Sequence, residues 1–187
     1  AGYIDSCPPA SMIHLNYPRI DGKGEIKVTW MDGGLLPKRP DELLPDEEMG
    51  NWDGGVIFEG TKGKMMSGCY GENPTLLPTK RMKEDRLPKQ KLTRVPEGHY
   101  VQWVNACMAG YGNAETSSPF EYAGPFTESI LMGNLAIRSW MIKNPKLTGW
   151  GDKYLGRKKL LWDAANMKIT NFDEANQFVK REYRTGW

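Results

Sequence analysis

The segment VTWMDGGLLPKRPDELL, residues 28–44, restricts the fold more than any other part of this chain. Residues 25–31 alternate apolar and polar side chains, as a half-buried β-strand does. Asp32, Gly33 and Gly34 follow at once, and prolines stand at positions 37, 40 and 45. Because glycine adopts backbone angles closed to other residues and proline lacks an amide donor, the strand must end there and a shaped loop must begin. Such a loop is either a spacer or a site.

Other segments carry strand patterns as well. Residues 11–17 alternate in the same way, and the turn-rich residues 19–24 predict that this strand pairs antiparallel with 25–31. Residues 56–59 and 64–67 flank the glycine-bracketed turn 60–63 and predict a hairpin, which Cys69 and Tyr70 could extend. Residues 159–162 and 167–170 are predicted to form two more short strands.

Helical spacing dominates the rest of the chain. An apolar helix is predicted from Pro96 and Glu97 to the stop at Gly110, and a second over residues 126–140 after the start signals Ser118-Pro119 and Gly124-Pro125. Gly133 in the second helix costs about 1 kcal/mol relative to alanine, so we expect the first helix or the sheet to pack closely there. Asn171 and Glu174 form a capping-box pattern for a last helix.

The order of these elements is strands, strands, helices, strands, helix, without the alternation that predicts a parallel sheet. We therefore predict an α+β fold with a mainly antiparallel open β-sheet and helices packed on one face, as a single domain over residues 1–187. Residues 71–95 contain three prolines and many basic side chains among few apolar ones, which predicts a long surface excursion with either a solvated or a contact role.

Composition excludes several classes of protein. The formal charge of +2, from 25 basic and 23 acidic residues, is too balanced to indicate a nucleic-acid or anionic-membrane partner. No segment approaches the roughly 20 apolar residues of a membrane span and the first residues lack a signal-peptide pattern, so we expect a soluble chain whose compartment is undetermined. Cys7, Cys69 and Cys107 are far apart and odd in number, and we interpret them as small buried apolar residues.

Motifs for local chemistry are absent from the sequence. It contains neither G-x-G-x-x-G nor G-x-x-x-x-G-K-[ST], no HExxH and no G-x-S-x-G, and its two histidines, His14 and His99, are distant in sequence. We therefore expect no metal and no nucleophilic triad. Polar groups do stand at the predicted ends of elements: Asp32, Arg39, His99, Tyr122, Glu128, Asn134 and Asp163.

Each of these groups has a structural and a functional interpretation. Asp32 is either a turn-forming residue before two glycines or a group facing a ligand, and His99 either stands near a helix start or belongs to a site. Glu128 and Asn134 are six residues apart on one helix and point in different directions, so we expect at most one of them to line a given pocket. Asn134 is the better interface candidate, because Gly133 lets another backbone approach.

Several segments together resemble one protein family. They are IKVTWMDGGLLPKRPDEL, VIFEGTKGKM, GCYGENPTLLP, GHYVQWVNACMAG, SSPFEYAGPFTESILMGNLAIRS, KLLWDAANMKITNFDEAN and YRTGW. In their residues and in their order they are similar to the C-terminal half of the glucose-fructose oxidoreductase, inositol dehydrogenase and rhizopine catabolism (Gfo/Idh/MocA) family, most of all its Bacteroidetes-like bacterial branch. The similarity extends from about residue 11 to the end of the chain.

The resemblance implies a division of labour. Family members join a Rossmann domain, which binds NAD or NADP, to an α/β domain with an open antiparallel sheet that shapes the pocket for a sugar or polyol and commonly forms the homo-oligomer interface. The catalytic Glu-Lys-Pro motif and its Asp and His partners have no counterpart here, so this chain is expected to bind no cofactor and to be inactive alone, as an excised or proteolysed piece. The candidates for substrate binding or the interface are Asp32, Arg39, His99, Tyr122 and Asn134.

By the same resemblance, the proline-rich loop leaves the sheet edge to meet either substrate or a neighbouring subunit, and we favour the subunit. A second hypothesis from a different class is a non-catalytic carbohydrate-binding or scaffold module, suggested by seven Trp, eight Tyr and five Phe. Burial of Trp30, Trp103 and Trp162 would remove its main support. Nucleic-acid binding through residues 80–91 is a third and weaker hypothesis.

Overall fold

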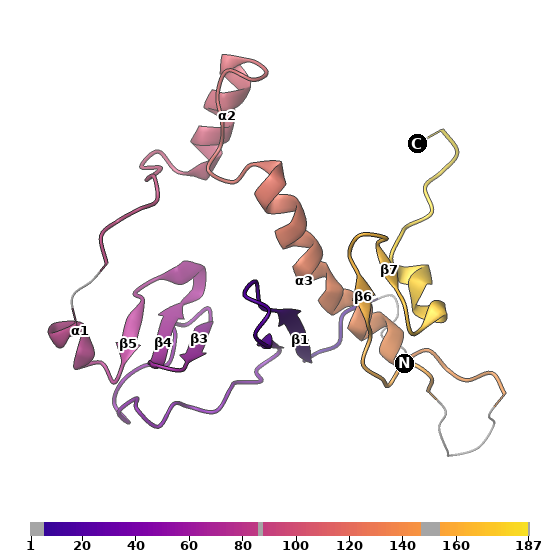
Figure 1. Cartoon of the computed structure of the whole chain (residues 1–187), viewed down its shortest axis with the longest axis horizontal. Coiled ribbons are helices and arrows are strands. Elements are labelled where there is room, and N and C mark those ends of the chain that lie inside the picture. Colours follow the sequence, from indigo (N-terminus) through magenta and orange to yellow (C-terminus); the bar gives the residue numbers. More distant parts are fainter. Residues whose placement is uncertain (1–5, 86–87, 147–153, 187) are drawn as a thin grey trace. The chain divides into compact units, whose positions relative to one another are not determined.

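The computed structural model describes residues 6–85, 88–146 and 154–186. Its elements are shown in Figure 1. In chain order they are β1 (Met12–Pro18), β2 (Glu25–Met31), β3 (Gly55–Gly60), β4 (Gly63–Gly68), the 3-10 turn η1 (Cys69–Gly71), β5 (Thr75–Leu77), α1 (Arg81–Glu84), α2 (His99–Ala109), α3 (Phe120–Trp140), β6 (Trp162–Asp163), β7 (Lys168–Ile169) and the 3-10 segment η2 (Asp173–Phe178).

The chain divides into two compact units, which we describe separately. Unit 1 comprises residues 1–36 and 97–187, and unit 2 comprises residues 37–96. The fold is α+β and every strand pair is antiparallel, as the sequence predicts. Among the described residues the strands form three small sheets, β1-β2 and β6-β7 in unit 1 and β3-β4-β5 in unit 2.

The β1-β2 pair of unit 1 matches its predicted position closely. The register places Ile13 opposite Trp30, Leu15 opposite Val28 and Tyr17 opposite Ile26, which brings the apolar side chains of both strands onto one face. β2 ends at Met31 and Gly33 follows with a φ of 64°. A Cβ atom on Gly33 would lie 2.1 Å from the carbonyl oxygen of Pro9, so glycine is required for both its conformation and its lack of a side chain.

Helix α3 packs on β1, and Gly133 marks the contact. A Cβ atom at Gly133 would lie 3.2 Å from Cδ1 of Ile13, which confirms the prediction that the sheet or a helix approaches closely there. The Tyr17 hydroxyl donates a hydrogen bond of 3.1 Å to the Ser129 carbonyl oxygen. Burial raises the pKa of Tyr17 above its ordinary value.

The start of α3 differs from the prediction. The helix begins at Phe120 after the N-cap residue Pro119, and Pro125 lies inside it rather than before it. Pro125 is the sixth residue of the helix, beyond the first turn, so its missing amide removes one backbone hydrogen bond from the helix. The second of the two start signals is therefore not a boundary.

The C-terminal elements of unit 1 pack against the end of α3 (Figure 1). Their core consists of Ile169, Phe172 and Ala175. The predicted strands 159–162 and 167–170 shrink to two residues each, and the predicted last helix is a 3-10 segment without a side-chain cap. The prediction of a capping box at Asn171 was therefore wrong. The Asn171 side chain instead accepts a hydrogen bond from the Leu161 amide and donates one to the Lys159 carbonyl oxygen, and both bonds are 2.8 Å long.

Unit 2 is built on the predicted hairpin of β3 and β4. The third strand, β5, and the short helix α1 fall inside residues 71–95, so describing that whole stretch as a surface excursion was wrong. Leu77 explains the error, because this side chain is almost fully buried although prolines and basic residues surround it. Cys69 and Tyr70 form η1 and do not extend the hairpin.

The cysteines also differ from expectation, since Cys7 and Cys107 are exposed and Cys69 is half-buried, and all three are free. Among the described residues no helix combines the length and the apolar character needed to cross a membrane.

Candidate functional site

Asp32 has a structural role at the end of the β1-β2 pair. Its carboxylate accepts hydrogen bonds from the Ser11 amide at 2.6 Å, the Ser11 hydroxyl at 2.8 Å and the Trp30 indole at 2.9 Å. The hydrogen bond from the Ser11 side chain and, to a smaller extent, the one from Trp30 lower the pKa of Asp32 below its ordinary value. The turn-forming interpretation of Asp32 accounts for all of these contacts.

Arg39 lies in unit 2, and its side chain links two parts of the proline-rich loop to each other. Its Nη2 atom donates to the carbonyl oxygens of Leu44 and Glu47. Glu47 in turn accepts hydrogen bonds from the Leu44 amide and the Thr79 hydroxyl. The guanidinium therefore closes residues 39–47 into a compact turn.

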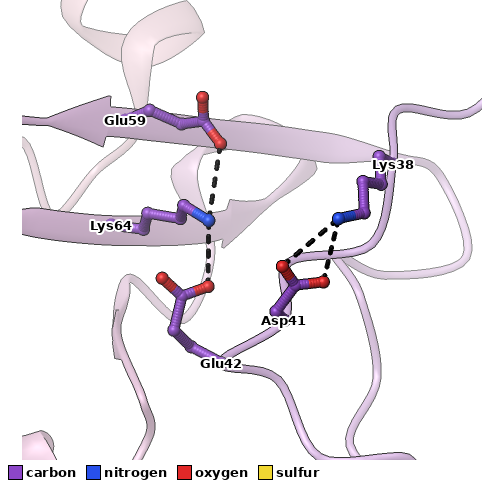
Figure 2. Close-up of polar contacts among 5 residues, drawn as sticks. All are labelled: Lys38, Asp41, Glu42, Glu59 and Lys64. Atoms are coloured by element: carbon purple, nitrogen blue, oxygen red, sulfur yellow. Dashed lines mark hydrogen bonds and ion pairs between the residues drawn. The ribbon is translucent and has the colours of Figure 1, made fainter.

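A second set of polar contacts ties the same loop to the hairpin, as Figure 2 shows. The Lys64 ammonium on β4 lies 2.9 Å from a carboxylate oxygen of Glu42 in the loop and 3.7 Å from one of Glu59 on β3. Lys38 lies 3.0 Å from Asp41 within the loop. Hydrogen bonding to Glu42 raises the pKa of Lys64, and the same contact lowers the pKa of Glu42. This arrangement fastens the loop to the β3-β4 hairpin.

His99 and Tyr122 are exposed in unit 1, and their ring contacts are with residues of their own helices. His99 opens α2, with its ring centroid 4.1 Å from that of Tyr100. Tyr122 on α3 stacks on Phe126 at a centroid distance of 6.0 Å. Asp163 is the last residue of β6, and hydrogen bonds from the Asn166 side chain and, to a smaller extent, from the Asn166 amide lower its carboxyl pKa.

The main hollow of unit 1 runs along α3. It has a volume of about 1200 Å³, is open to solvent on one side, and is lined by α3, the β6-β7 hairpin, η2 and the first described residues. Glu128 and Asn134 both line it, so the prediction that at most one of them would do so was wrong. The reason is geometric, because a hollow that follows a helix over several turns collects residues from a broad sector of its surface.

One row of α3 positions faces this hollow at helical spacing. Thr127, Leu131, Asn134 and Arg138 follow one another at intervals of four, three and four residues, and all of them line the hollow. The row combines hydroxyl, amide and guanidinium groups with apolar contacts. Sequence analysis selected Asn134 from this row but missed Arg138, although its position one turn after Asn134 was a readable signal.

Trp162 and Glu128 form a polar link across the hollow. The Trp162 indole on β6 donates a 2.8 Å hydrogen bond to Oε1 of Glu128. Both side chains are half-buried. This contact fixes the orientation of the indole and engages one oxygen of the carboxylate.

Metal-ligating residues do not gather in the part of the chain that the structure describes: no group of three or more His, Cys, Asp or Glu side chains is placed to hold an ion. The hollow along α3 is a candidate site for a ligand other than a metal ion. Of the predicted residues, it contains Asn134 and Glu128.

A scan against models of protein families finds no match to this chain, and a search of curated proteins likewise finds none. The Gfo/Idh/MocA resemblance is carried by the quoted segments alone.

Proposed function

We propose that this chain is the C-terminal portion of an NAD(P)-dependent oxidoreductase of the Gfo/Idh/MocA type, acting on a sugar, polyol or related hydroxyl compound. In this role it shapes the substrate pocket and contributes the subunit interface. The observation that carries the proposal is the ordered run of family-like segments from residue 11 to the end. In the structure these segments include β2, the β3-β4 hairpin, α2, α3 and the β6-β7 pair.

The chemistry divides between this chain and a dinucleotide-binding domain. The parent enzyme moves a hydride between a substrate C–H and the nicotinamide, and a lysine and a histidine outside this chain handle the hydroxyl proton. This chain supplies walls and orienting groups. The row of Thr127, Asn134 and Arg138 along the hollow provides hydrogen-bonding groups of the kind that hold hydroxyl-rich ligands.

The proposed subunit contact uses the β1-β2 face. Ile26, Val28 and Trp30 point to one face of β2 and remain exposed, with Trp30 at 55%. Large apolar side chains grouped on a strand face are typical of an interface. This observation supports assembly through the sheet of unit 1.

Dinucleotide binding tests the proposal directly. The chain is titrated with NAD and NADP by calorimetry, and the product of the complete reading frame is titrated in parallel. We expect no binding by the chain and micromolar binding by the longer product, together with reduction of the dinucleotide in the presence of a polyol. Binding by the chain itself, or no oxidoreductase activity in the longer product, would contradict the assignment.

A non-catalytic carbohydrate-binding or scaffold module remains the alternative. The exposure of two of the three tryptophans named in the sequence analysis supports it. Trp103 on α2 is 63% exposed and Trp30 is also exposed, whereas Trp162 is half-buried. A module of this kind would bind neutral oligosaccharides through exposed aromatic faces, and its affinity would fall when Trp30 or Trp103 becomes Ala. The same titration with the complete reading-frame product discriminates, because a module gains no dehydrogenase activity from it.

A further inference from the structure

Arg138 is a charged residue that lines the hollow, and its guanidinium is only partly engaged by contacts within the chain. It lies in the last turn of α3, and its guanidinium carbon is 4.4 Å from the centre of the Phe178 ring on η2. Its Nε atom is buried and has no hydrogen-bond partner among the described residues. None of the ion pairs between described residues includes Arg138. Stacking on Phe178 holds the guanidinium in place, which lowers the entropy lost when it binds an anion.

The acid in the hollow does not neutralise this arginine. Glu128 forms no ion pair with Arg138, and one of its carboxylate oxygens accepts the Trp162 indole hydrogen bond. It also stands ten residues before Arg138, which corresponds to about 15 Å along the helix axis. A second cation, Arg181, lines the same hollow. The end of the hollow near the C-terminus of α3 is therefore cationic in its side chains.

Asn134 supplies the neighbouring polar group. It precedes Arg138 by four residues, so the two side chains are adjacent on one face of α3, with Cβ atoms about 6 Å apart. Asn134 is exposed, lines the hollow and makes no hydrogen bond to another described residue that would occupy its amide. An amide one turn from a guanidinium matches a ligand with a hydroxyl next to an oxyanion, because the amide donates to and accepts from a hydroxyl while the guanidinium donates in pairs to the oxyanion.

We propose that the hollow binds a polyol that carries an oxyanion, with the oxyanion at Arg138 and an adjacent hydroxyl at Asn134. This inference rests on the proposed function, which supplies the polyol, and narrows its substrate class from neutral to anionic compounds. A sugar acid and a sugar phosphate share the chemistry that the two side chains recognise. The partial negative charge at the end of α3 opposes an anion, so the arginine is essential to binding rather than auxiliary.

The test compares three probes of similar size: D-gluconate, D-glucose 6-phosphate and uncharged D-sorbitol. Each is titrated into the isotope-labelled chain, and binding is followed by NMR through the backbone amide signals of α3 and the indole signal of Trp162. We expect one or both anions to bind at least tenfold more tightly than sorbitol. Binding of gluconate alone assigns a carboxylate, and binding of glucose 6-phosphate alone assigns a phosphate.

Variants locate the binding. Arg138→Gln should weaken anion binding at least tenfold, Arg138→Lys should keep part of it, and Asn134→Asp should weaken it by adding a negative charge beside the arginine. Arg157→Gln is the matched control, because Arg157 also stacks on aromatic rings, those of Trp140 and Tyr154, but does not line the hollow. The amide spectrum of each variant verifies its fold.

Three results would overturn the inference: equal binding of sorbitol and the anions, equal loss in the Arg157→Gln control, or no binding of any probe by the folded chain. Equal sorbitol binding in the hollow would leave the proposed oxidoreductase intact and remove only its preference for anions. Failure of the dinucleotide experiment, in contrast, would remove the proposed function without changing which probe the hollow prefers.

Discussion

Asp32 shows how one side chain closes the end of a strand pair. Its three hydrogen bonds connect Ser11, the residue before β1, with the end of β2, and the adjacent Gly33 lets the chain pass close to Pro9. The sequence indicated both features, a turn-forming acid and a required glycine. It did not indicate which side chains would donate to the acid, because Ser11 lies 21 residues away.

At Gly33 the cost of a side chain can be separated from the cost of the backbone angle. Gly33→Ala places a methyl group against the Pro9 carbonyl and should lower the free energy of unfolding by about 3 kcal/mol. Gly22→Ala is the control, because Gly22 has a φ of 68° but nothing within 4 Å, and should cost about 1 kcal/mol. Urea denaturation measures both. Equal losses would show that the Pro9 contact relaxes without cost.

Glu128 allows a similar separation of charge from hydrogen bonding. Glu128→Ala removes the acceptor of the Trp162 indole and should cost about 1 kcal/mol of stability, whereas Glu128→Gln keeps an acceptor and should cost less. Urea denaturation with the indole NMR signal of Trp162 as a second readout measures the effect. An unchanged indole signal in Glu128→Ala would contradict the contact.

At the scale of elements, prediction succeeded where a periodic pattern had a clear stop. β1, β2 and α2 lie within three residues of their predicted positions. Alternation ends before the turn-rich residues 19–24 for β1 and at Asp32 for β2, and helical spacing ends at Gly110 for α2. Prediction failed where tertiary contacts decide the element. Leu77 builds β5 in a proline-rich segment, Asn171 bonds to residues 159 and 161 instead of capping a helix, and Pro125 lies within α3. The hollow could not be predicted for the same reason, because Phe178 and Trp162 are distant from α3 in sequence and approach it only in the folded chain.

The proline-rich loop of unit 2 should respond to acid. The pKa of Glu42 is lowered by Lys64, and that of Glu47 by the Thr79 hydroxyl. Each folded-state pKa lies below the ordinary value of 4.5. The ionised carboxylates therefore stabilise the folded conformation of the loop above pH 4.5, and this stabilisation is lost as the pH falls through the lowered pKa values. Hydrogen exchange at the Leu43 amide, corrected for its intrinsic pH dependence, should show decreasing protection below pH 4.5.

The matched variants for this loop are Glu42→Gln and Glu59→Gln. Glu42→Gln should lower the protection of Leu43 at pH 7 and flatten its dependence on pH. Glu59→Gln should change little, because Glu59 is 3.7 Å from Lys64 and its side chain is 70% exposed. A larger effect from Glu59→Gln would mean that the hairpin, and not the loop, depends on Lys64.

At the scale of the whole molecule, apolar side chains remain uncovered within unit 1. α2 contains no buried residue and contacts no other described helix or strand, although Tyr100, Trp103 and Met108 are large and apolar. The β2 face adds Ile26, Val28 and Trp30. Exposing this many apolar side chains to water is unfavourable, and covering them with a partner surface lowers the free energy. This agrees with the proposed role of the chain in subunit and domain contacts.

Self-association of the isolated chain follows from these surfaces. We expect the chain to bind the dye ANS and to form species larger than a monomer at micromolar concentrations in light scattering. Combining Trp103→Gln with Val28→Thr should reduce both signals, because one substitution acts on α2 and the other on β2. Trp52→Gln is the control: Trp52 is 90% exposed but lies in the tight 51–54 turn of unit 2, outside both surfaces, and its loss should leave association unchanged. A strictly monomeric chain without dye binding would show that α2 and β2 are covered within the chain itself, and the proposed interface would then have to lie elsewhere.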